Sequence, residues 1–547
     1  MNTDGPTQSQ PPWVADLSLE LYAVQLISLM SLSISAAYAL SRLLARLISP
    51  PHRSRLLSVV DAVPRRVIGR AYVEEMDWRR YLASLLALNG VVLALDALLL
   101  ALQPALGGPR LSPDLIFNIA SSFVTNTDLQ HYAGSMLTTY SQVFVITYTM
   151  FVAPASGLAA SFAFMRGFIR RTDSLGNFYA DFTRSIIMVL LPLSFVSALL
   201  LILMGVPQTF QTQVIVGALQ GGSHVIRLGP VASLESIKLL GNNGGGYYAA
   251  NSASPLENPS GISNFYESFL MLLLPLSIPL AFGRVAGTRR GASILGAMLA
   301  GMCVLLGMAL LGGATLGVEP RLGAFGTLLF NTVSMATNTG ATASSLFAMS
   351  PLAVSSFLMA MFVQAVPGAI GVGFMYMMIF VVITLFILGL MVGKTPEIMG
   401  MKISPRDVKI SAAAFLVHPL AILIPLVLAF AAGQAQHLLG TPGPLQFTEV
   451  LYEFTSAAAN NGSDYLGAAA NSPFWNYLTG TVMLAGRFVP LALMMALAGS
   501  FAGKDRRRMP EPVETQGILF AVLLLGMTFL LTILTFFPFL ILGPFSI

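Results

Sequence analysis

Long apolar runs recur along the 547 residues of this chain and limit the folds open to it. A run of about 20 apolar residues can cross a bilayer as an α-helix, since a helix satisfies its own backbone groups in lipid. Charged residues make up 10% of the chain, whereas soluble domains carry roughly 25%. The runs also lack the alternating pattern of a membrane β-barrel. The sequence therefore predicts an all-α polytopic membrane protein.

Ten of these runs are long enough to cross a membrane, and the seventh is about twice the necessary length. The seventh run contains Pro367, Gly368 and Gly371, which predict a broken helix. Such a break can form a gate in a transporter, and close packing of small residues is the alternative. The ten runs lie at about 19–41, 82–103, 139–164, 185–205, 264–283, 292–316, 353–392, 410–433, 473–502 and 515–541.

Basic residues lie almost entirely on one side of these spans. The alternate loops at 42–80, 166–184, 284–290, 394–409 and 504–508 hold 24 of the 29 lysines and arginines. Because short loops rich in Lys and Arg stay cytoplasmic, both termini are predicted to be extracytoplasmic, in a cell (inner) membrane protein. The formal net charge of +5 follows from this asymmetry and fits anionic lipid headgroups better than nucleic acid.

Four outward-facing connections share one plan: a short apolar segment, a tight motif of Asn, Thr and Gly, and then a full span. This repetition predicts four copies of span, half-helix, loop and span. Irregular backbone at membrane depth must be buried in protein or line a water-filled cavity. The motif residues are Thr125, Asn126 and Thr127; Asn242, Asn243 and Gly244; Asn338, Thr339 and Gly340; and Asn460, Asn461 and Gly462.

These four motifs suit a site for a monovalent cation. If they meet on one axis, their carbonyl oxygens can replace the hydration shell of K⁺. Glycine allows backbones to crowd, and asparagine tolerates left-handed conformations. None of the twelve motif positions is a carboxylate, which favours a carbonyl filter over an acidic ring for divalent ions. The central asparagines of the four copies are expected to be Asn126, Asn243, Asn338 and Asn461.

Charged residues stand around the motifs. The carboxylates could concentrate cations at the outer mouth, or could be solvated loop charges. Lys238 and Arg487 fall at membrane depth, where a charge usually has a role. They could shape the field below the filter, or each could pair with the carbonyl end of a half-helix. The carboxylates are Asp128, Glu257, Glu453 and Asp464.

The chain resembles KdpA, the family of potassium-binding subunits of the bacterial Kdp potassium-transporting ATPase, within a superfamily of K⁺ transporters with four channel-like repeats. The resemblance spans nearly the whole chain. It implies a filter at the twelve motif positions and a role in selectivity for Gln130 and Gly244. Asp128 stands where the family usually has Asn, and Gln364 where a Glu is usual. The segments that carry the resemblance are "SFVTNTDLQHYAG", "GPVASLESIKLLGNNGGGYYAANSASPLENPS", "GLMVGKTPEIMGMKI", "SAAANNGSDYLGAAANSPFWN" and "AGRF".

The resemblance also implies a division of labour. The subunit binds external K⁺ and passes it through an intramembrane tunnel to a P-type ATPase subunit, KdpB, while KdpC and the small single-span KdpF complete the complex. This chain has no Asp-Lys-Thr-Gly phosphorylation site, so we expect no ATP chemistry and no organic cofactor, with K⁺ as the transported ion. One alternative is a self-sufficient Trk/Ktr-type K⁺ channel or cation symporter, and another is a purely structural subunit.

The expected organisation follows from the four copies. The segments are an extracytoplasmic tail (1–18), an extra first helix with a basic cytoplasmic loop (19–81), repeat 1 (82–164), repeat 2 (185–283), repeat 3 with the broken helix (292–392), repeat 4 (410–502), and an extra last helix with the C-terminus (515–547).

Overall fold

The computed structural model describes residues 12–49, 55–170, 172–217, 221–314, 317–440, 443–506 and 514–547. Ten helices in these segments are long and apolar enough to cross a membrane, which confirms the predicted number. They are Glu20–Ile48 of α1 (Pro12–Ile48), α3 (Trp78–Ala101), α5–α6 (Thr139–Ile169), α7–α8 (Phe178–Leu203), α10 (Gly261–Ala286), α11 (Arg290–Gly312), α14 (Val372–Met391), α15 (Pro405–Ala431), α18 (Pro473–Ala502) and α19 (Ile518–Leu542).

Two of these spans contain a π-helical segment. Gln142–Thr147 joins α5 (Thr139–Ser141) to α6 (Tyr148–Ile169), and Ser185–Leu190 joins α7 (Phe178–Arg184) to α8 (Leu191–Leu203). The long seventh run is divided as its Pro and Gly residues predicted. Helix α13 (Pro351–Val363) ends before the break, and α14 begins after it.

Four short helices lie at the positions of the predicted half-helices, each directly before one of the four motifs. Two of them have proline at the first or second position. Proline suits this position because the first N–H groups of a helix have no hydrogen-bond partner within the helix, so the missing N–H of proline costs nothing there. They are α4 (Pro113–Val124), α9 (Val231–Leu240), α12 (Gly323–Ala336) and α17 (Pro444–Ala459). Two further short helices are α2 (Arg55–Ile68) and α16 (Gln434–Leu439).

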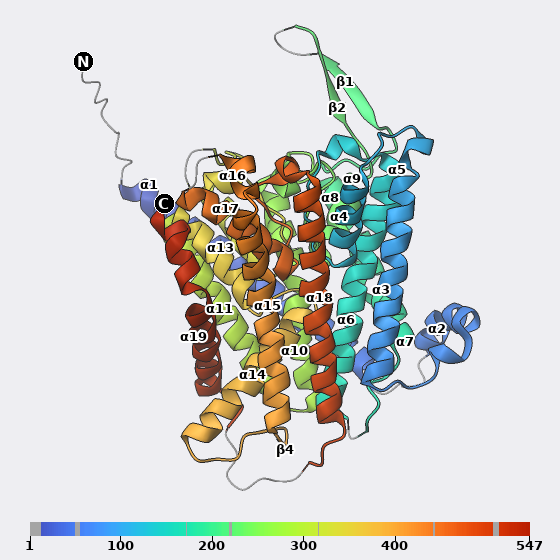
Figure 1. The fold of residues 1–547 in the computed structure, drawn as a ribbon, viewed down its shortest axis with the longest axis vertical. Coiled ribbons are helices and arrows are strands. Elements are labelled where there is room, and N and C mark those ends of the chain that lie inside the picture. Colours follow the sequence, from blue (N-terminus) through green and yellow to red (C-terminus); the bar gives the residue numbers. More distant parts are fainter. Residues whose placement is uncertain are drawn as a thin grey trace.

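Two small antiparallel hairpins were not expected in an all-α fold. Strands β1 (Gln213–Gly217) and β2 (Ser223–Arg227) form an exposed ribbon that projects beyond one end of the bundle (Figure 1). Strands β3 (Glu397–Ile398) and β4 (Met401–Lys402) close a tight turn at the other end. Both hairpins lie outside the spans, so the membrane-embedded part is helical as predicted.

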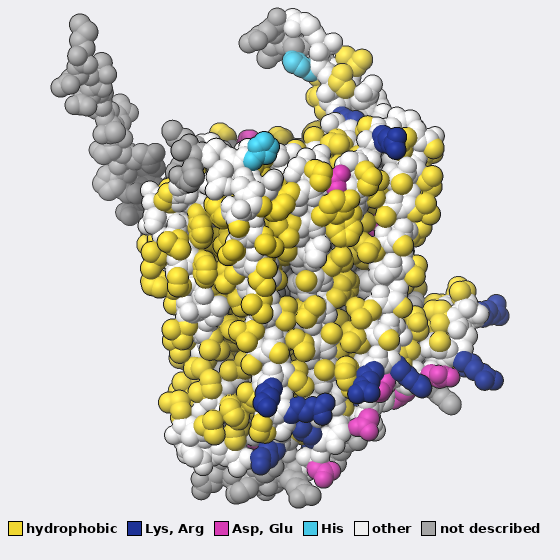
Figure 2. Space-filling view, in the orientation of Figure 1, with side chains coloured by type: hydrophobic (Ala, Val, Ile, Leu, Met, Phe, Trp, Pro, Cys, Tyr) yellow, Lys and Arg dark blue, Asp and Glu magenta, His cyan; other side chains and the backbone are white. Residues whose placement is uncertain are grey.

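The spans run side by side and place the broken helix among the most enclosed elements (Figure 1). Nearly every residue of α13 and of the first three turns of α14 is buried, whereas α1, α3 and α19 are among the least buried spans. The start of α1 and the C-terminus lie at the end of the bundle that carries the β1–β2 hairpin (Figure 1). Most of the Lys and Arg side chains visible in Figure 2 gather at the opposite end.

The predicted N-terminal tail is only partly tested. Residues 1–11 lie outside the described segments, as do parts of the basic loops at 50–54, 171 and 507–513. Helix α1 begins at Pro12, so residues 12–18 are helical and do not belong to an irregular tail.

Candidate functional site

Each short helix ends directly before one of the four motifs. In the first three loops, the second residue after the helix is an asparagine in the left-handed conformation, namely Asn126, Asn242 and Asn338. In the fourth loop, the left-handed asparagine is Asn460, the first residue after α17. Their φ angles are 62°, 52°, 48° and 55° for Asn126, Asn242, Asn338 and Asn460, respectively. Asparagine suits this position because its short polar side chain tolerates left-handed backbone.

The structure corrects the alignment of the four copies. The equivalent asparagines are Asn126, Asn242, Asn338 and Asn460, so the expected use of Asn243 and Asn461 is one residue too late. In each loop, the residue after the left-handed asparagine donates its N–H to the carbonyl five residues earlier. These bonds join Thr127 to Ser122 (2.9 Å), Asn243 to Lys238 (2.7 Å), Thr339 to Ser334 (2.8 Å) and Asn461 to Ser456 (2.9 Å).

Side-chain hydrogen bonds connect neighbouring loops. The Asn126 Nδ2 donates to the carbonyl oxygen of Asn242 at 2.6 Å. The Asn242 Nδ2 donates to Thr339 Oγ1 at 3.0 Å, and the Asn460 Nδ2 donates to Thr127 Oγ1 at 2.9 Å. The bonds therefore link the first loop to the second, the second to the third, and the fourth to the first. All twelve predicted filter positions are buried.

Backbone carbonyl groups from three loops surround Gly244 of the remaining loop. A Cβ atom built on Gly244 would lie 2.8 Å from the Asn461 oxygen, 2.9 Å from the Thr339 oxygen and 3.0 Å from the Thr127 oxygen. The third and fourth loops also adjoin, since a Cβ on Gly340 would collide with the same Asn461 oxygen. The four motifs thus converge, and their carbonyl oxygens crowd around one point.

The groups at the point where the four motifs converge are oxygen ligands. Within the described residues, no group of three or more His, Cys, Asp or Glu side chains is placed to hold a metal ion. Neutral carbonyl oxygens on fixed backbone suit a weakly hydrated monovalent cation, whereas divalent ions are usually held by carboxylates. The arrangement therefore suits a monovalent cation better than a divalent one.

Gln130 connects the first loop to the second by hydrogen bonds, beside the converging carbonyl groups. Its Oε1 accepts a hydrogen bond from the Gly246 N–H at 2.8 Å, and its Nε2 donates to the Gly246 carbonyl at 3.0 Å. The same Nε2 also donates to Tyr132 Oη at 2.7 Å. Gln130 therefore holds the loop segment that follows Gly244, which places the predicted selectivity residue next to the converging loops.

The carboxylates around the motifs are mostly buried. Asp128, Glu257 and Glu453 are fully buried, and Asp464 is partly exposed. For the first three, the alternative of solvated loop charges is therefore wrong, while a role at the outer mouth stays a prediction. Glu257 accepts the N–H groups of Tyr247 and Tyr248, so it also fixes the backbone after the second motif.

Asp128 differs from Glu257 and Glu453 because both of its carboxylate oxygens lack a side-chain partner within the described residues. Asp128 is left-handed, with a φ of 59°, and Gly340 and Gly462 occupy the equivalent positions of the third and fourth loops with φ angles of 79° and 105°. A carboxyl group buried in this way favours its neutral form, so a cation at the converging carbonyl groups would stabilise the charged carboxylate.

Lys238 pairs with a carboxylate and not with a helix carbonyl. Its Nζ lies 2.7 Å from Glu235 Oε2 and 3.0 Å from Ser252 Oγ, and both charged side chains are fully buried. Glu257 and Glu267 are further buried carboxylates within electrostatic range of the ammonium. Sequence analysis missed Glu235, although its i, i+3 spacing on a short helix was a usable signal. The pair offsets most of the field that Lys238 could exert on the motifs.

Arg487 lies beside the break between α13 and α14. Its Nη2 donates weakly to the Ala153 carbonyl of α6, at 3.4 Å, so its partner also differs from the expected half-helix end. A Cβ on Gly157 would lie 2.9 Å from this Nη2 and 3.3 Å from the Ile370 oxygen, which places the guanidinium next to the break. Arg487 is 7% exposed. It is the remaining candidate for a positive field near the motifs.

The break itself contacts the converging loops. The Ile370 N–H donates to Asn242 Oδ1 at 3.0 Å, and the Gly368 N–H donates to the Ala336 carbonyl at 2.8 Å. Gln364 caps α13 in the left-handed conformation, and its side chain is buried. The segment that contains Pro367 and Gly371 therefore lies against the second and third motifs, where a gate would act.

Comparison with known proteins agrees with this architecture. The crystal structure of the potassium transporter TrkH from Vibrio parahaemolyticus superposes with a TM-score of 0.53 at 15% identity, covering 88% of this chain and 99% of that chain. At this identity the similarity shows the fold alone.

Sequence comparisons are more specific. The potassium-transporting ATPase potassium-binding subunit of Geobacillus kaustophilus (strain HTA426) is 39% identical over 517 residues, covering 90% of this chain and 92% of that protein. The corresponding subunit of Alicyclobacillus acidocaldarius is 41% identical over 521 residues, covering 89% and 91%. The family model described as "Potassium-transporting ATPase A subunit" matches residues 27–546. The chain therefore belongs to the KdpA family, the potassium-binding subunits of the Kdp potassium-transporting ATPase.

Proposed function

We propose that the four motifs form the selectivity filter through which this subunit takes up K⁺. The observation that carries the proposal is the position of Gly244, around which the carbonyl oxygens of three other loops converge at 2.8–3.0 Å. Such oxygens can replace the water around a potassium ion. The proposed filter comprises Thr125, Asn126, Thr127, Asn242, Asn243, Gly244, Asn338, Thr339, Gly340, Asn460, Asn461 and Gly462, with Asp128, Gln130, Glu257 and Asp464 at its mouth.

The chain organisation follows from this filter. Segments 82–164, 185–283, 292–392 and 410–502 are the four repeats, each supplying one short helix and one motif. Segments 19–81 and 515–547 add a first and a last helix outside the fourfold arrangement. The carbonyl ends of α4, α9, α12 and α17 precede the motifs, so their partial negative charge also favours a cation there.

The orientation follows from the basic residues. The end of the bundle rich in Lys and Arg is cytoplasmic in our proposal, and the filter and both termini face the extracytoplasmic side. An ion that leaves the filter meets the break between α13 and α14, where Gln364, Pro367, Gly368 and Gly371 form a gate and Arg487 supplies a positive field. Positive charge below the filter opposes leakage of cations towards the cytoplasm.

The catalytic ATPase is another subunit of the Kdp complex. We propose that K⁺ passes from the filter through an intramembrane tunnel to that P-type ATPase subunit, KdpB, and that KdpC and KdpF complete the assembly. The relatives that share about 40% of this sequence over nine-tenths of its length are named as ATPase subunits, which favours this assignment over a self-sufficient Trk/Ktr-type channel.

Removal of the Asp128 charge tests the position of the ion. We expect Asp128→Asn to raise the K⁺ concentration for half-maximal binding by roughly tenfold or more, because two charges a few ångströms apart interact by several kcal/mol at an effective dielectric constant of about 20. The measurement is calorimetric titration of the purified complex with K⁺ and, separately, with Na⁺.

Glu319→Gln is the matched control for Asp128→Asn, since it removes the same charge from a partly exposed side chain at the outer end. The control should bind K⁺ as the wild type does. If both variants bind K⁺ equally well, the cation does not lie beside Asp128 and the proposed filter is misplaced.

Gln130→Arg should also weaken K⁺ uptake, by adding positive charge at the mouth and by releasing Gly246. We expect the half-saturating K⁺ concentration in K⁺-stimulated ATPase assays of the complex to rise by roughly tenfold. Gln130→Met separates the two causes, because it loses the Gly246 contacts without adding charge. An unchanged concentration dependence in Gln130→Arg would place Gln130 away from the ion path.

A further inference from the structure

Helix α2 leaves the bundle sideways at its basic end (Figure 1). Its valines Val59, Val63 and Val67 recur every four residues and form one stripe, with exposed fractions of 68%, 69% and 81%. In Figure 2, hydrophobic side chains cover the upper part of this protrusion, and basic side chains lie at its outer tip and lower edge. An exposed apolar stripe beside basic residues is typical of a helix that lies in the plane of a membrane surface.

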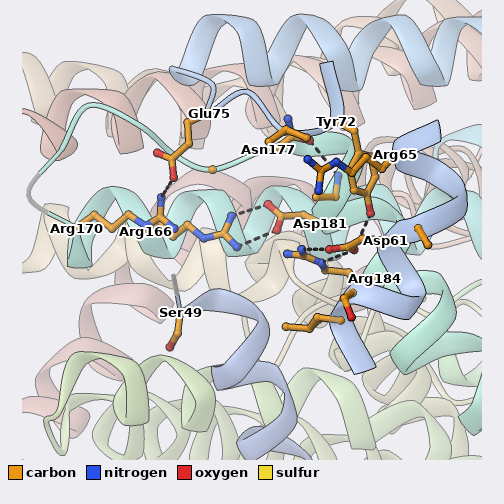
Figure 3. A pocket seen from close by; sticks show the side chains of 16 residues that line it. Ser49, Asp61, Arg65, Tyr72, Glu75, Arg166, Arg170, Asn177, Asp181 and Arg184 are labelled. Atoms are coloured by element: carbon orange, nitrogen blue, oxygen red, sulfur yellow. Dashed lines mark hydrogen bonds and ion pairs between the residues drawn. The ribbon is translucent and has the colours of Figure 1, made fainter. Parts of the chain in front are cut away.

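The opposite face of α2 lines a pocket of about 890 Å³. Ser58, Asp61, Ala62 and Arg65 form its wall on the α2 side, and the basic ends of α6 and α7 form the other side (Figure 3). The pocket lies where the spans that contain α6 and α7 end, which is the level of lipid headgroups.

Ion pairs build the walls of this pocket and hold α2 in place. Arg166 contacts both carboxylate oxygens of Asp181, at 2.5 and 2.8 Å, and Arg184 contacts both of Asp61, at 3.0 and 2.6 Å (Figure 3). Tyr72 donates its hydroxyl proton to Asp61 at 2.9 Å. Burial and the Asp61 carboxylate raise the pKa of Tyr72 above its ordinary value, so Tyr72 remains a neutral donor. These charged and polar groups are paired with one another, so they leave little net charge with which to bind a ligand.

Two further arginines of the pocket are not satisfied in this way. Arg170 reaches only Glu75, at 3.4 Å, and its Nε has no hydrogen-bond partner within the described residues. The Glu75 side chain is 56% exposed, so water screens this contact. Arg65 is exposed and forms no ion pair in the described part of the chain. The two guanidinium groups stand at different ends of the pocket (Figure 3) and leave it positively charged.

We propose that α2 lies in the headgroup layer of the membrane and that the pocket beneath it binds the phosphate group of an anionic phospholipid. The valine stripe then faces acyl chains, and Arg170 or Arg65 contacts the phosphate. An anionic phospholipid matches both the valine stripe and the pocket, because it carries apolar acyl chains next to an anionic group at the level of the headgroups. Arginine forms paired hydrogen bonds with phosphate oxygens. The proposal does not depend on the K⁺ filter.

Lipid exposure of the valine stripe is tested by site-specific fluorescence. The single cysteine is removed by Cys303→Ser, and a fluorophore is attached to Val63→Cys in the complete complex in vesicles. Spin-labelled acyl chains should quench this label strongly. A label on Ala62→Cys, the next residue on the pocket face, should be quenched weakly. Equal quenching of both labels overturns the orientation, and protection of Val63→Cys in the complex shows that a protein subunit covers the stripe instead.

The headgroup site is tested with two matched double variants. Arg65→Gln with Arg170→Gln removes the free charges of the pocket, whereas Arg66→Gln with Arg70→Gln removes two neighbouring charges outside it. Native mass spectrometry then measures retention of phosphatidylglycerol, with phosphatidylcholine as the neutral reference. Because one of the two arginines contacts the phosphate, we expect retention in the pocket variant to weaken by at least roughly fivefold, and retention in the second variant to stay close to that of the wild type.

Two results would overturn the headgroup site. An equal loss in both double variants would show general attraction to an anionic surface and no built site. Complete displacement of the lipid by inorganic phosphate would assign the pocket to the free anion.

Discussion

Alanine in place of Gly244 should weaken K⁺ binding by at least a hundredfold. The added methyl carbon would lie 2.8, 2.9 and 3.0 Å from three carbonyl oxygens, which is tighter than an ordinary van der Waals contact. The methyl group would fill the space in which those oxygens converge, and each belongs to backbone that a side-chain rotation cannot move. Gly244→Asp adds still more bulk and should also impair uptake at low external K⁺.

The effect is measured as the half-saturating K⁺ concentration of the complex, both by calorimetric titration and by K⁺-stimulated ATPase activity. A hundredfold loss corresponds to about 2.7 kcal/mol. Gly296→Ala is the matched control, because a Cβ there meets no atom within 4 Å and the residue lies within α11. Affinity within twofold of the wild type in Gly244→Ala would remove Gly244 from the filter and contradict the proposed convergence.

Replacement of Lys238 by methionine should destabilise the subunit by about 3–5 kcal/mol. The Glu235 carboxylate would lose its partner at 2.7 Å while it remains fully buried, with Glu257 and Glu267 nearby. An unpaired charge in this setting has neither water nor a counter-ion to stabilise it. The free energy of unfolding, measured by denaturant titration in detergent, reports the change.

The double variant Lys238→Met with Glu235→Gln separates loss of the pair from loss of packing. It should recover much of the stability, because no uncompensated charge remains between these two positions. Glu319→Gln provides the contrast, since it breaks a partly exposed ion pair with Arg321, at 3.6 Å, and should cost less than about 1 kcal/mol. If Lys238→Met cost no more than Glu319→Gln, the buried pair would not support the second short helix.

The two predictions address different aspects of the same loop. Gly244 lies at the converging carbonyl groups, and Lys238 lies six residues earlier on α9, where it pairs with Glu235. The first variant should therefore lose K⁺ affinity while it remains folded, and the second should lose stability first. A stable Gly244→Ala complex with weak K⁺ binding would link the filter geometry directly to function.

Much of the architecture could be predicted because its signals are local. A span needs about 20 apolar residues, so ten such runs could be located without any knowledge of their neighbours. The break in the seventh run was equally visible, because Pro367 and the nearby glycines disturb a helix wherever it packs. The repetition of the Asn, Thr and Gly motifs also identified four equivalent loops before their contacts were known.

The errors concern properties that depend on neighbours in space. Assignment of Asn243 and Asn461 as central residues was one position late, since the two adjacent asparagines in each of those loops look alike in sequence. Pairing with a carbonyl group was one of the two alternatives for Lys238, but its partners are a carboxylate and Ser252, a residue from the following loop. The burial of Asp128, Glu257 and Glu453 could not be seen, because hydrophilic loop residues usually face water.

The sequence alone determined the helical membrane class, the number of spans and the positions of the four motifs. Each of these follows from the hydropathy and conformational preferences of short segments. Only the tertiary structure decided that Asn126, Asn242, Asn338 and Asn460 are equivalent, that carbonyl oxygens surround Gly244, and that Asp128 is buried. Such facts depend on distances between segments about a hundred residues apart, and those distances arise from packing the whole bundle.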